Sequence, residues 1–354
     1  MKYIGIDVHK RISTVCVIDE SNKTELELLN IETSAGGFIA VTLEYRPDQC
    51  RIAIENSTRS HFVQRHFEGL GYDIISIHPA DFPDIAKSKV KNDIIDARKL
   101  AELRRDIDDG RRKVKISHLS SDENMRRKAL CRVCMECTIT KNESILRIWE
   151  YLSLHDIKMP DSYKSVDSTR SIKFLKGVGD PALTIMVNTV ELMASQTDNA
   201  DAELERLFAY DEDVILLRTM KAIGVRTAAT IVTAIDGIER FDSPEKLVSF
   251  FGLDPATDES AGKRKKGKHI TKDGDPLVRY GLSNVVTNHA RMCPGSDISK
   301  YYRRMSKRMP HWKAVIATAR KIVCVIWVML TRREPFMMNP SKKRKDESGQ
   351  ALLA

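Results

Sequence analysis

The chain has 354 residues, which is enough for two domains and a connector at about 150 residues per domain. Hydrophobic residues make up 42% of it and aromatic residues 6%, a composition that is ordinary for a globular protein and excludes a largely disordered chain. Lys and Arg outnumber Asp and Glu by 58 to 49. The resulting charge of +9 favours a polyanionic partner such as nucleic acid without establishing one.

Three features bear on where the protein works. The longest apolar run near the C-terminus, residues 322–330, has nine residues and falls short of the roughly 20 that a membrane helix needs. An acidic residue, Asp7, interrupts the N-terminal segment, which we therefore do not expect to be a signal peptide. The seven cysteines are odd in number and scattered, as is typical of reduced thiols. We expect a cytoplasmic protein that binds no membrane.

Residues 1–110 alternate strand and helix signals. Short apolar or alternating runs predict strands at residues 3–8, 13–18, 25–31, 51–54 and 73–77. Helices are expected from the Gly36-Gly37 break to Glu44, over 60–70, and from about Asn92. Three strands followed by helix, strand, helix, strand and helix is the order of the ribonuclease-H-like (RuvC-like) fold. We therefore predict an α/β domain of that kind.

Residues 111–212 are charged and contain few Gly or Pro, which predicts a helical connector. A coiled coil and a solvated helical arm fit this pattern equally well, because no clean heptad is repeated. Cys131, Cys134 and Cys137 recur every third residue within it. We interpret them as one stripe of a helix; a metal site is the less favoured alternative, since it would need a fourth ligand close by.

Residues 213–337 are predicted to form a third, mainly helical (all-α) region. Helices are expected over 216–223 and 227–235, and Gly224 between them suggests a helix-hairpin-helix-like turn whose amides could hold a phosphate. Any helical hairpin needs such a turn, so this signal alone is weak. Further helices are expected from Pro244, over 275–292 and over 312–331. The basic tail, residues 338–354, is expected to be disordered.

Four acids of the first region are candidates for one metal site. Asp7 lies in the first expected strand and Glu55 ends the fourth, and these two strands are neighbours in a ribonuclease-H-like sheet. Asp93 and Asp96 are three residues apart on one face of the helix that would cross them. Four converging carboxylates repel one another unless cations neutralise them, and Mg²⁺, or Mn²⁺ in its place, suits such oxygen ligands.

The alternative interpretation is that each acid only caps a helix or decorates a turn, which fits Asp93 taken alone. Asp7 argues against it for the set. A carboxylate inside the apolar run that begins at Ile4 is costly to bury without a partner.

A basic loop lies in the third region. Its seven cations are predicted to bind nucleic-acid phosphates, and they are Lys263, Arg264, Lys265, Lys266, Lys268, Lys272 and Arg279. Glycines punctuate the loop, which allows the backbone to approach a phosphate closely. A solvated charged loop is the alternative. Ser260 stands just before it, but a serine near a glycine is too common to identify a nucleophile from spacing.

Several motifs resemble the DEDD transposases of the insertion-sequence one-ten family, which includes the Piv-type DNA invertases. The N-terminal motifs are YIGIDVHK at 3–10, IENST at 54–58 and KNDIIDARKLA at 91–101. The C-terminal motifs are IGVRTA at 223–228, FGLDP at 251–255, SAGK at 260–263, GK at 267–268, ITKDG at 270–274 and LVR at 277–279. Asn92 departs from the Thr expected before the third acid. The resemblance covers roughly residues 1–105 and 213–337.

The resemblance implies a RuvC-like domain whose acids correspond to Asp7, Glu55, Asp93 and Asp96, and a C-terminal transposase domain whose catalytic serine corresponds to Ser260. Thr271 and Ser283 are the alternative hydroxyls, because the spacing after the serine varies in the family. The resemblance also implies donor and target DNA as substrates, a structured guide (bridge) RNA encoded by the element, and association with a prokaryotic nucleoid.

The expected reaction is strand exchange by transesterification, in which the serine attacks a phosphodiester and no nucleotide cofactor is needed. Because the acids and Ser260 lie in different predicted domains, we expect a homo-oligomer, dimer or tetramer, to bring them together. Two other functions fit parts of the pattern. A junction-resolving nuclease would use the same acids with water and would have no use for Ser260, whereas a non-enzymatic nucleic-acid-binding protein would leave the four acids unexplained.

Overall fold

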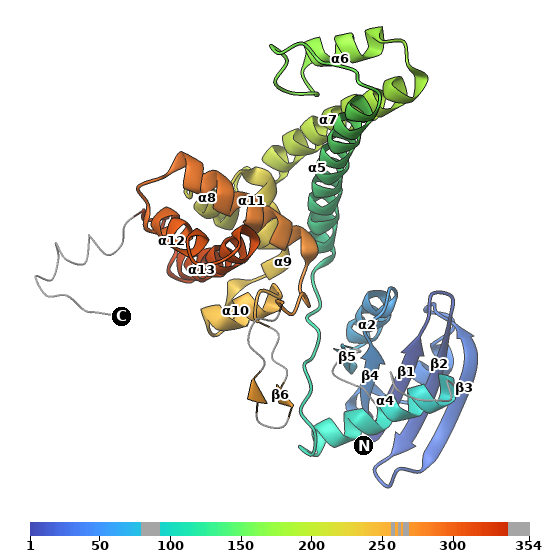
Figure 1. Ribbon diagram of the computed structural model, residues 1–354. Helices are drawn as coiled ribbons and strands as arrows, with labels where there is room; N and C mark the ends of the chain where they lie inside the picture. Colours follow the sequence, from blue (N-terminus) through green and yellow to red (C-terminus); the bar gives the residue numbers. More distant parts are fainter. Residues whose placement is uncertain (79–92, 256–258, 261–262, 265–268, 339–354) are drawn as a thin grey trace, which may run out of the picture. The chain divides into compact units, whose positions relative to one another are not determined.

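The computed structural model describes residues 1–78, 93–255, 259–260, 263–264 and 269–338. The chain divides into two compact units, residues 1–120 (unit 1) and 121–354 (unit 2), which are described separately. Unit 1 is a mixed α/β unit, and unit 2 is mainly helical (Figure 1). Both properties agree with the predicted fold class.

Unit 1 is built on a five-stranded sheet in the order β3-β2-β1-β4-β5. Its strands are β1 (Lys2–Val8), β2 (Ile12–Asp19), β3 (Thr24–Glu32), β4 (Cys50–Glu55) and β5 (Asp73–Ile77). Strand β2 pairs antiparallel with both β1 and β3, and β4 and β5 run parallel to β1. The first and fourth strands are therefore neighbours, as predicted.

Helices cover both faces of this sheet. On one face α1 (Ile39–Glu44) and α2 (Ser60–Gly69) enclose a core centred on Phe38 and Phe67, and the short helix η1 (Pro47–Gln49) leads from α1 into β4. On the other face lies α4 (Asp93–Asp108), which crosses in front of the strands in Figure 1. Because successive side chains of a strand point to opposite faces, β1 supplies Ile4 and Ile6 to the first core and Tyr3 to the α4 side.

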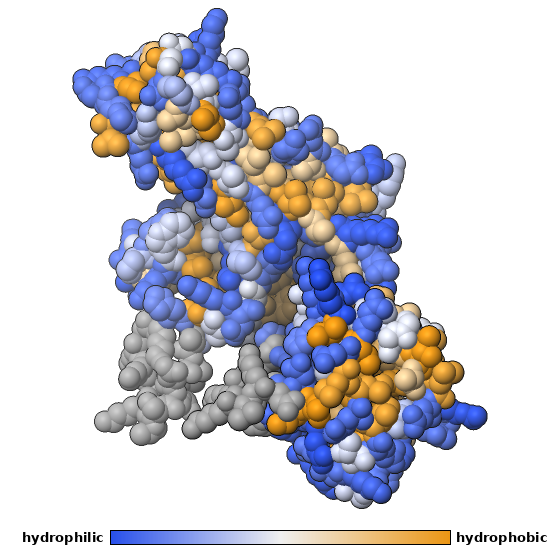
Figure 2. All heavy atoms as spheres, turned by 90° about the vertical axis from the view of Figure 1, so that its right-hand side faces the viewer, coloured by the Kyte–Doolittle hydropathy of each residue, from blue (hydrophilic) through white to orange (hydrophobic). Residues whose placement is uncertain are grey.

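A long helical arm begins unit 2. Helices α5 (Asp122–Leu154) and α7 (Pro181–Leu207) run side by side, with α6 (Thr169–Gly177) at the far end (Figure 1). A separate apolar cluster around Ile148 and Leu183 holds that end together. Figure 2 shows hydrophobic atoms interspersed with hydrophilic ones over the arm. The exposed apolar side chains of the arm include Leu146, Trp149, Leu154, Ile185 and Leu192.

The cysteine stripe lies on α5, as predicted. Cys131 and Cys134 are buried in the main core of unit 2, and Cys137 is half-buried. Burial raises the pKa of Cys131 to about 11 and that of Cys134 to about 12, so both thiols stay protonated near neutral pH. These two side chains pack the N-terminal half of α5 against α9.

Helices of different lengths around one core form the rest of the described part of unit 2. They are α8 (Glu212–Arg218), α9 (Val225–Ile235), η3 (Ile238–Arg240), α10 (Pro244–Phe250), α11 (Pro276–Met292), α12 (Asp297–Ser306) and α13 (His311–Arg332), together with the two-residue strands β6 (Glu259–Ser260) and β7 (Lys263–Arg264). The predicted helix over 216–223 is wrong in its end: α8 stops at Arg218, and backbone turns at Met220 and Ile223 follow it.

Helix α13 matches the predicted helix over 312–331 to within one residue at each end. Its most apolar 18-residue window has a mean hydropathy of 1.8, so by length and composition the helix could cross a membrane, although the apolar run 322–330 alone looked too short. The cations that interrupt its sequence do not break the helix. Half of its most apolar window is buried in unit 2, where Val315, Ile322 and Ile326 are fully enclosed. The helix therefore serves as a core helix of this unit.

Candidate functional site

Asp7 and Glu55 lie at the ends of adjacent parallel strands on the face that α4 covers. Ile6 pairs with Ile54, which puts Asp7 and Glu55 one position further along β1 and β4. Two residues earlier on the same face stand Gly5 and Ala53. Side chains two apart on a strand share a face, so both acids point to the side where α4 packs.

Gly5 determines how closely α4 approaches. A Cβ atom at this position would lie 1.8 Å from the carbonyl oxygen of Ala97 and 2.5 Å from the amide nitrogen of Ala101. Only a residue without a side chain lets the helix rest directly on β1. Because Ala97 sits over Gly5, the preceding turn of α4, with Asp93 and Asp96, lies toward Asp7.

The side chains at this point are within reach of one metal ion. Ligand atoms of Asp7, His9 and Asp93 all lie within 4.8 Å of one another. The His9 Nε2 atom is 3.4 Å from Oδ2 of Asp7 and 3.9 Å from Oδ1 of Asp93. The buried Oδ1 of Asp96 accepts no hydrogen bond and has the Lys99 ammonium group 3.5 Å away.

Electrostatics link all four predicted acids. The pKa of Asp7 is raised to about 6, first by burial and then by the charges of Asp93, Asp96 and Glu55, while His9 lowers it. A carboxylate that is 9% exposed and surrounded by three other acids is poorly stabilised as an anion. The structure thus brings Asp7 and Asp93 together with His9, and Asp96 and Glu55 lie near enough for their charges to raise the pKa of Asp7. Asp7 is the acid that most needs a cation.

Two polar networks hold α4 in place. Arg98 donates hydrogen bonds to Oγ1 of Thr24 at 2.6 Å and to the carbonyl of Asn22 at 3.2 Å, which ties the helix to the β2–β3 turn. At its C-terminal end the buried Arg104 pairs with Asp73 at 2.9 Å and with Asp108 at 3.2 Å. The first turn of α4 is therefore positioned by contacts outside the acid cluster.

The loops beside the acids are also fixed. The Ser57 hydroxyl donates to the carbonyl of Val8 at 3.1 Å, which joins the end of β4 to the end of β1. The Thr33 hydroxyl donates to the carbonyl of His9 at 3.0 Å. The backbone on either side of the acids is thus bonded to neighbouring strands before any ligand is present.

The donor set fits a divalent cation. Carboxylate oxygens dominate, and one of them, Oδ1 of Asp96, is buried without a hydrogen bond, as an unused ligand atom would be. His9 was not predicted; the sequence reasoning placed it only in a charged turn. Its position two residues after Asp7, directly behind the end of β1, was the only signal in the sequence.

The segment that carries Ser260 is a hairpin with a tight base. Pro255 pairs with Ile270, and the Thr271 amide donates to the carbonyl of Asp254 at 2.9 Å. Gly252, at φ +64°, crosses Gly274 so closely that a Cβ on Gly252 would lie 2.7 Å from the amide nitrogens of Asp273 and Gly274. Further out, β6 and β7 form a short ladder in which Ser260 pairs with Lys263.

The predicted phosphate-binding cations of this region have different surroundings. Lys265, Lys266 and Lys268 lie outside the described residues, whereas Lys272 is exposed. Arg279 on α11 donates to the carbonyls of Phe251 at 3.2 Å and Gly274 at 2.5 Å, so its guanidinium group also braces the base of the hairpin.

Of the two alternative hydroxyls, Thr271 is half-buried in the hairpin base. The Ser283 hydroxyl donates to the carbonyl of Arg279, 2.9 Å away in its own helix.

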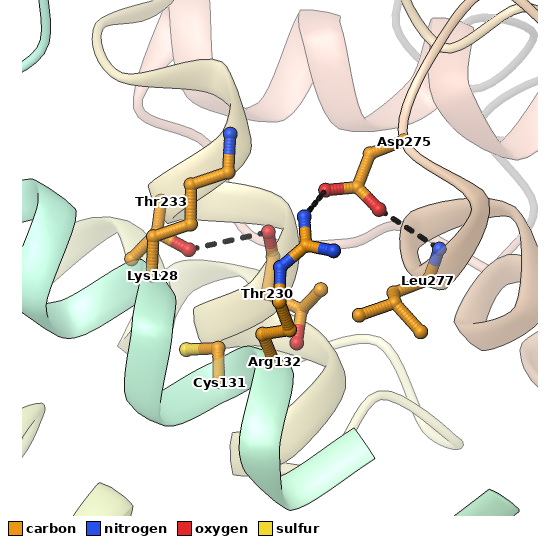
Figure 3. A pocket seen from close by; sticks show the side chains of 7 residues that line it. All are labelled: Lys128, Cys131, Arg132, Thr230, Thr233, Asp275 and Leu277. Carbon is orange, nitrogen blue, oxygen red and sulfur yellow. Dashed lines mark hydrogen bonds and ion pairs between the residues drawn. The ribbon is translucent and has the colours of Figure 1, made fainter. Parts of the chain in front are cut away.

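A shallow hollow lies next to this base, and its lining residues come from α5, α9 and the start of α11 (Figure 3). Asp275 caps α11 by accepting a hydrogen bond from the Leu277 amide at 2.9 Å, and it pairs with Arg132 of α5 at 3.3 Å. Lys128, Cys131, Thr230 and Thr233 complete the lining. The contacts of Asp275 therefore fix the start of α11 just after the hairpin.

Two family models match the chain. One, described as the transposase family IS116/IS110/IS902, matches residues 215–303. The other, a transposase model of the DEDD type named for IS110, matches residues 4–138. The first match contains the hairpin with Ser260, and the second contains all four acids.

Full-length relatives agree with these matches. The transposase for insertion sequence element IS1111A of Coxiella burnetii is 22% identical over 345 residues, covering 95% of this chain and 91% of that protein. The transposase for IS1328 of Yersinia enterocolitica is 22% identical over 338 residues, covering 94% and 98%. The chain thus belongs to the IS110 family of insertion-sequence transposases, as the resemblance of its motifs predicted.

Proposed function

We propose that this protein cuts and rejoins DNA by transesterification, with the four acids as a metal site and Ser260 as the nucleophile. The observation that carries the proposal is the buried Asp7 carboxylate, whose pKa is raised to about 6 by burial and by the charges of Asp93, Asp96 and Glu55. The strand order of unit 1, three antiparallel strands followed by two parallel ones, supports a ribonuclease-H-like domain of the RuvC kind.

Asp7, Glu55, Asp93 and Asp96 would hold Mg²⁺ or Mn²⁺, with His9 as a neighbour that can donate or accept a proton. Such ions neutralise charge on a phosphodiester and lower the pKa of a coordinated hydroxyl. The protein's part is to keep the acids in position through Gly5 and the Arg98 contacts.

In the proposed reaction the Ser260 oxygen forms a bond to phosphorus, and the bond from phosphorus to a sugar oxygen breaks. The serine loses its proton and the leaving sugar oxygen gains one, so the products are a phosphoserine link and a free hydroxyl end. The reverse attack by another DNA end restores the serine. Bond energy is conserved, and no nucleotide cofactor is required.

The family resemblance supports DNA as the substrate, a guide RNA as a partner, and a homo-oligomer in a bacterial cytoplasm. The basic hairpin from Lys263 to Lys272 would hold phosphates next to the serine. These partners are part of the proposal and follow from the family.

The adduct experiment tests the nucleophile. Labelled DNA that carries both element ends is incubated with the protein, its element RNA and Mg²⁺, and a protease-sensitive covalent adduct is sought. Ser260→Ala should abolish the adduct, whereas the matched variants Thr271→Ala and Ser283→Ala should keep it. An adduct that survives Ser260→Ala and is absent in another variant would reassign the nucleophile. Cleavage without any adduct would favour the water-using nuclease.

A further inference from the structure

The surface formed by α12 and the start of α13 is strongly cationic. Residues 298–333 contain ten Lys or Arg and no Asp or Glu. Among the described residues, no carboxylate lies within 4.0 Å of the charged groups of five exposed or half-exposed cations in this segment, namely Arg304, Lys307, Arg308, Lys313 and Lys321. By contrast, Lys300 pairs with Asp297 at 3.2 Å and Arg320 with Asp254 at 3.4 Å.

The fold turns these cations outward. On α12 the side chains of Ile298 and Met305 are buried, and on α13 those of Ala314 and Val315 are buried. The two helices pack against each other, so their inner faces are filled and their outer faces carry the charge. Unpaired cations on adjacent helices repel one another, and that cost is relieved when an anion binds.

Aromatic side chains lie among the cations. The Tyr301 ring is flanked by the Arg304 guanidinium at 5.3 Å and by the Lys321 ammonium at 5.1 Å. Trp312 is 69% exposed, and its ring lies 5.1 Å from that of His311. The Tyr302 hydroxyl lies 3.0 Å from Nδ1 of His311 and so fixes the imidazole beside the indole.

We propose that this α12–α13 surface binds an unpaired nucleic-acid strand, with phosphates on its cations and a base stacked on Trp312. Cations interleaved with exposed aromatic rings are the arrangement that single strands select, because their bases are free to stack. Bases in a duplex are already stacked and cannot reach the indole. The surface is separate from the basic hairpin at 263–272. The inference rests on the proposed function only in taking nucleic acid as the partner.

An anionic lipid surface is the competing partner for a cationic helix pair. Membrane-surface helices insert a broad apolar face. Here the apolar face of α13 is buried in unit 2, and Trp312 is the large apolar side chain left exposed in the described part of residues 298–333. The geometry therefore favours the nucleic-acid strand, and vesicle binding becomes an outcome of the test.

The test measures binding of the full-length protein to labelled single-stranded RNA, single-stranded DNA of the same sequence, and the corresponding DNA duplex, over a range of salt. Trp312→Ala should weaken single-strand binding about tenfold and leave duplex binding unchanged, and Trp312→Phe should restore most of it. Replacing Arg304, Lys307, Arg308 and Lys313 by Ala should flatten the salt dependence by about 0.7 of a log–log unit for each phosphate that is no longer neutralised.

Two controls separate this surface from total charge and from catalysis. The first is a variant in which four exposed cations of the arm, Lys158, Lys164, Arg170 and Lys173, are replaced by Ala; it has the same net charge and should bind as the wild type does. The second is Asp7→Asn, which should bind single strands normally although the proposed reaction is abolished. Failure of the reaction therefore leaves this inference standing.

Three results would overturn the inference. One is single-strand binding by Trp312→Ala that equals the wild type. Another is an equal loss of duplex and single-strand binding in that variant. The third is a four-cation variant that no longer binds phosphatidylserine vesicles but still binds nucleic acid as the wild type does. A preference for RNA over DNA would identify the strand as RNA through its 2′-hydroxyl groups.

Discussion

The acid cluster of unit 1 and the Ser260 hairpin of unit 2 are held in different ways. The acids stand at the ends of β1 and β4 and in the first turn of α4, so each is fixed by a regular element. Ser260 belongs to a two-residue strand, and the described base of its hairpin is the place where Gly252 crosses Gly274. A metal site needs ligands set to within fractions of an ångström, whereas a nucleophile that forms and releases a covalent link needs room to move. The same kind of change should therefore act differently in the two regions.

The largest effect is expected from Gly5→Ala. The new methyl group would lie 1.8 Å from the backbone oxygen of Ala97, so α4 must move away from β1. Overpacking against backbone costs about 3 kcal/mol, and the displaced turn should also lose its metal affinity. Thermal unfolding and Mg²⁺ titration measure both effects. Gly69→Ala is the matched control, because a Cβ there meets nothing within 4 Å. Equal stability of the two variants would disprove the close packing of α4.

Asp7→Asn sharpens the comparison through pH. The folded pKa of about 6 exceeds the unfolded value of about 3.9, so Asp7 contributes stability when protonated, fully below about pH 4. That contribution disappears as the pH rises through 6. Without metal, the wild type should therefore lose stability, at most about 3 kcal/mol, between pH 4 and 7 from this group, and Asp7→Asn should remove that part of the loss.

Divalent metal should reverse the order of stability of the wild type and the Asp7→Asn variant. At neutral pH, Mg²⁺ at 100 times its Kd should stabilise the wild type by about 2.7 kcal/mol, and it should have little effect on Asp7→Asn, which should also fail to cleave DNA. Asp48→Asn, which neutralises an exposed acid of the same unit, is the matched control. A wild-type rate of strand cleavage by Asp7→Asn in Mg²⁺ would refute the metal site.

The sequence predicted the acid cluster better than its surroundings for a physical reason. Strand order and the spacing of Asp93 and Asp96 follow from local patterns, and these suffice to place four acids on one face. The roles of Gly5 and His9 depend on which atoms of α4 and β1 meet, which no local pattern encodes.

In unit 2, too, local sequence patterns do not predict the contacts between elements. The early end of α8 and the bracing contacts of Arg279 depend on packing across the unit. The bounds of α13 were predicted to within one residue, whereas its capacity by length to cross a membrane was missed because only the apolar run 322–330 was counted. Sequence patterns thus predicted the candidate residues, and tertiary contacts determine how those residues are held.

Gly252→Ala tests the hairpin base. An alanine at φ +64° is strained by about 1 kcal/mol, and its methyl group would also press on the Asp273 and Gly274 amides. We expect adduct formation through Ser260 to fall while Mg²⁺ affinity stays unchanged. Gly179→Ala has a similar positive φ, +77°, with open space around it, and so isolates the backbone strain. If both variants form the adduct equally, the hairpin base does not position the serine.

The smallest effect is expected at the outer end of the hairpin, where Lys263, Arg264, Lys265 and Lys266 are replaced together by Ala. These cations follow Ser260 directly, and no described regular element beyond the short β6–β7 ladder holds them, so fold stability should change by less than about 0.5 kcal/mol. Duplex DNA binding should weaken, and the slope of log affinity against log salt should flatten by about 0.9 for each phosphate that the variant no longer neutralises. Fluorescence anisotropy at several salt concentrations gives that slope. The arm variant with Lys158, Lys164, Arg170 and Lys173 replaced by Ala removes the same charge elsewhere and should keep the wild-type slope. If the hairpin variant shows the same salt slope as this control, the hairpin cations are solvated surface and do not bind DNA. The proposed difference between the acid site and a DNA-binding hairpin would then no longer hold for the hairpin.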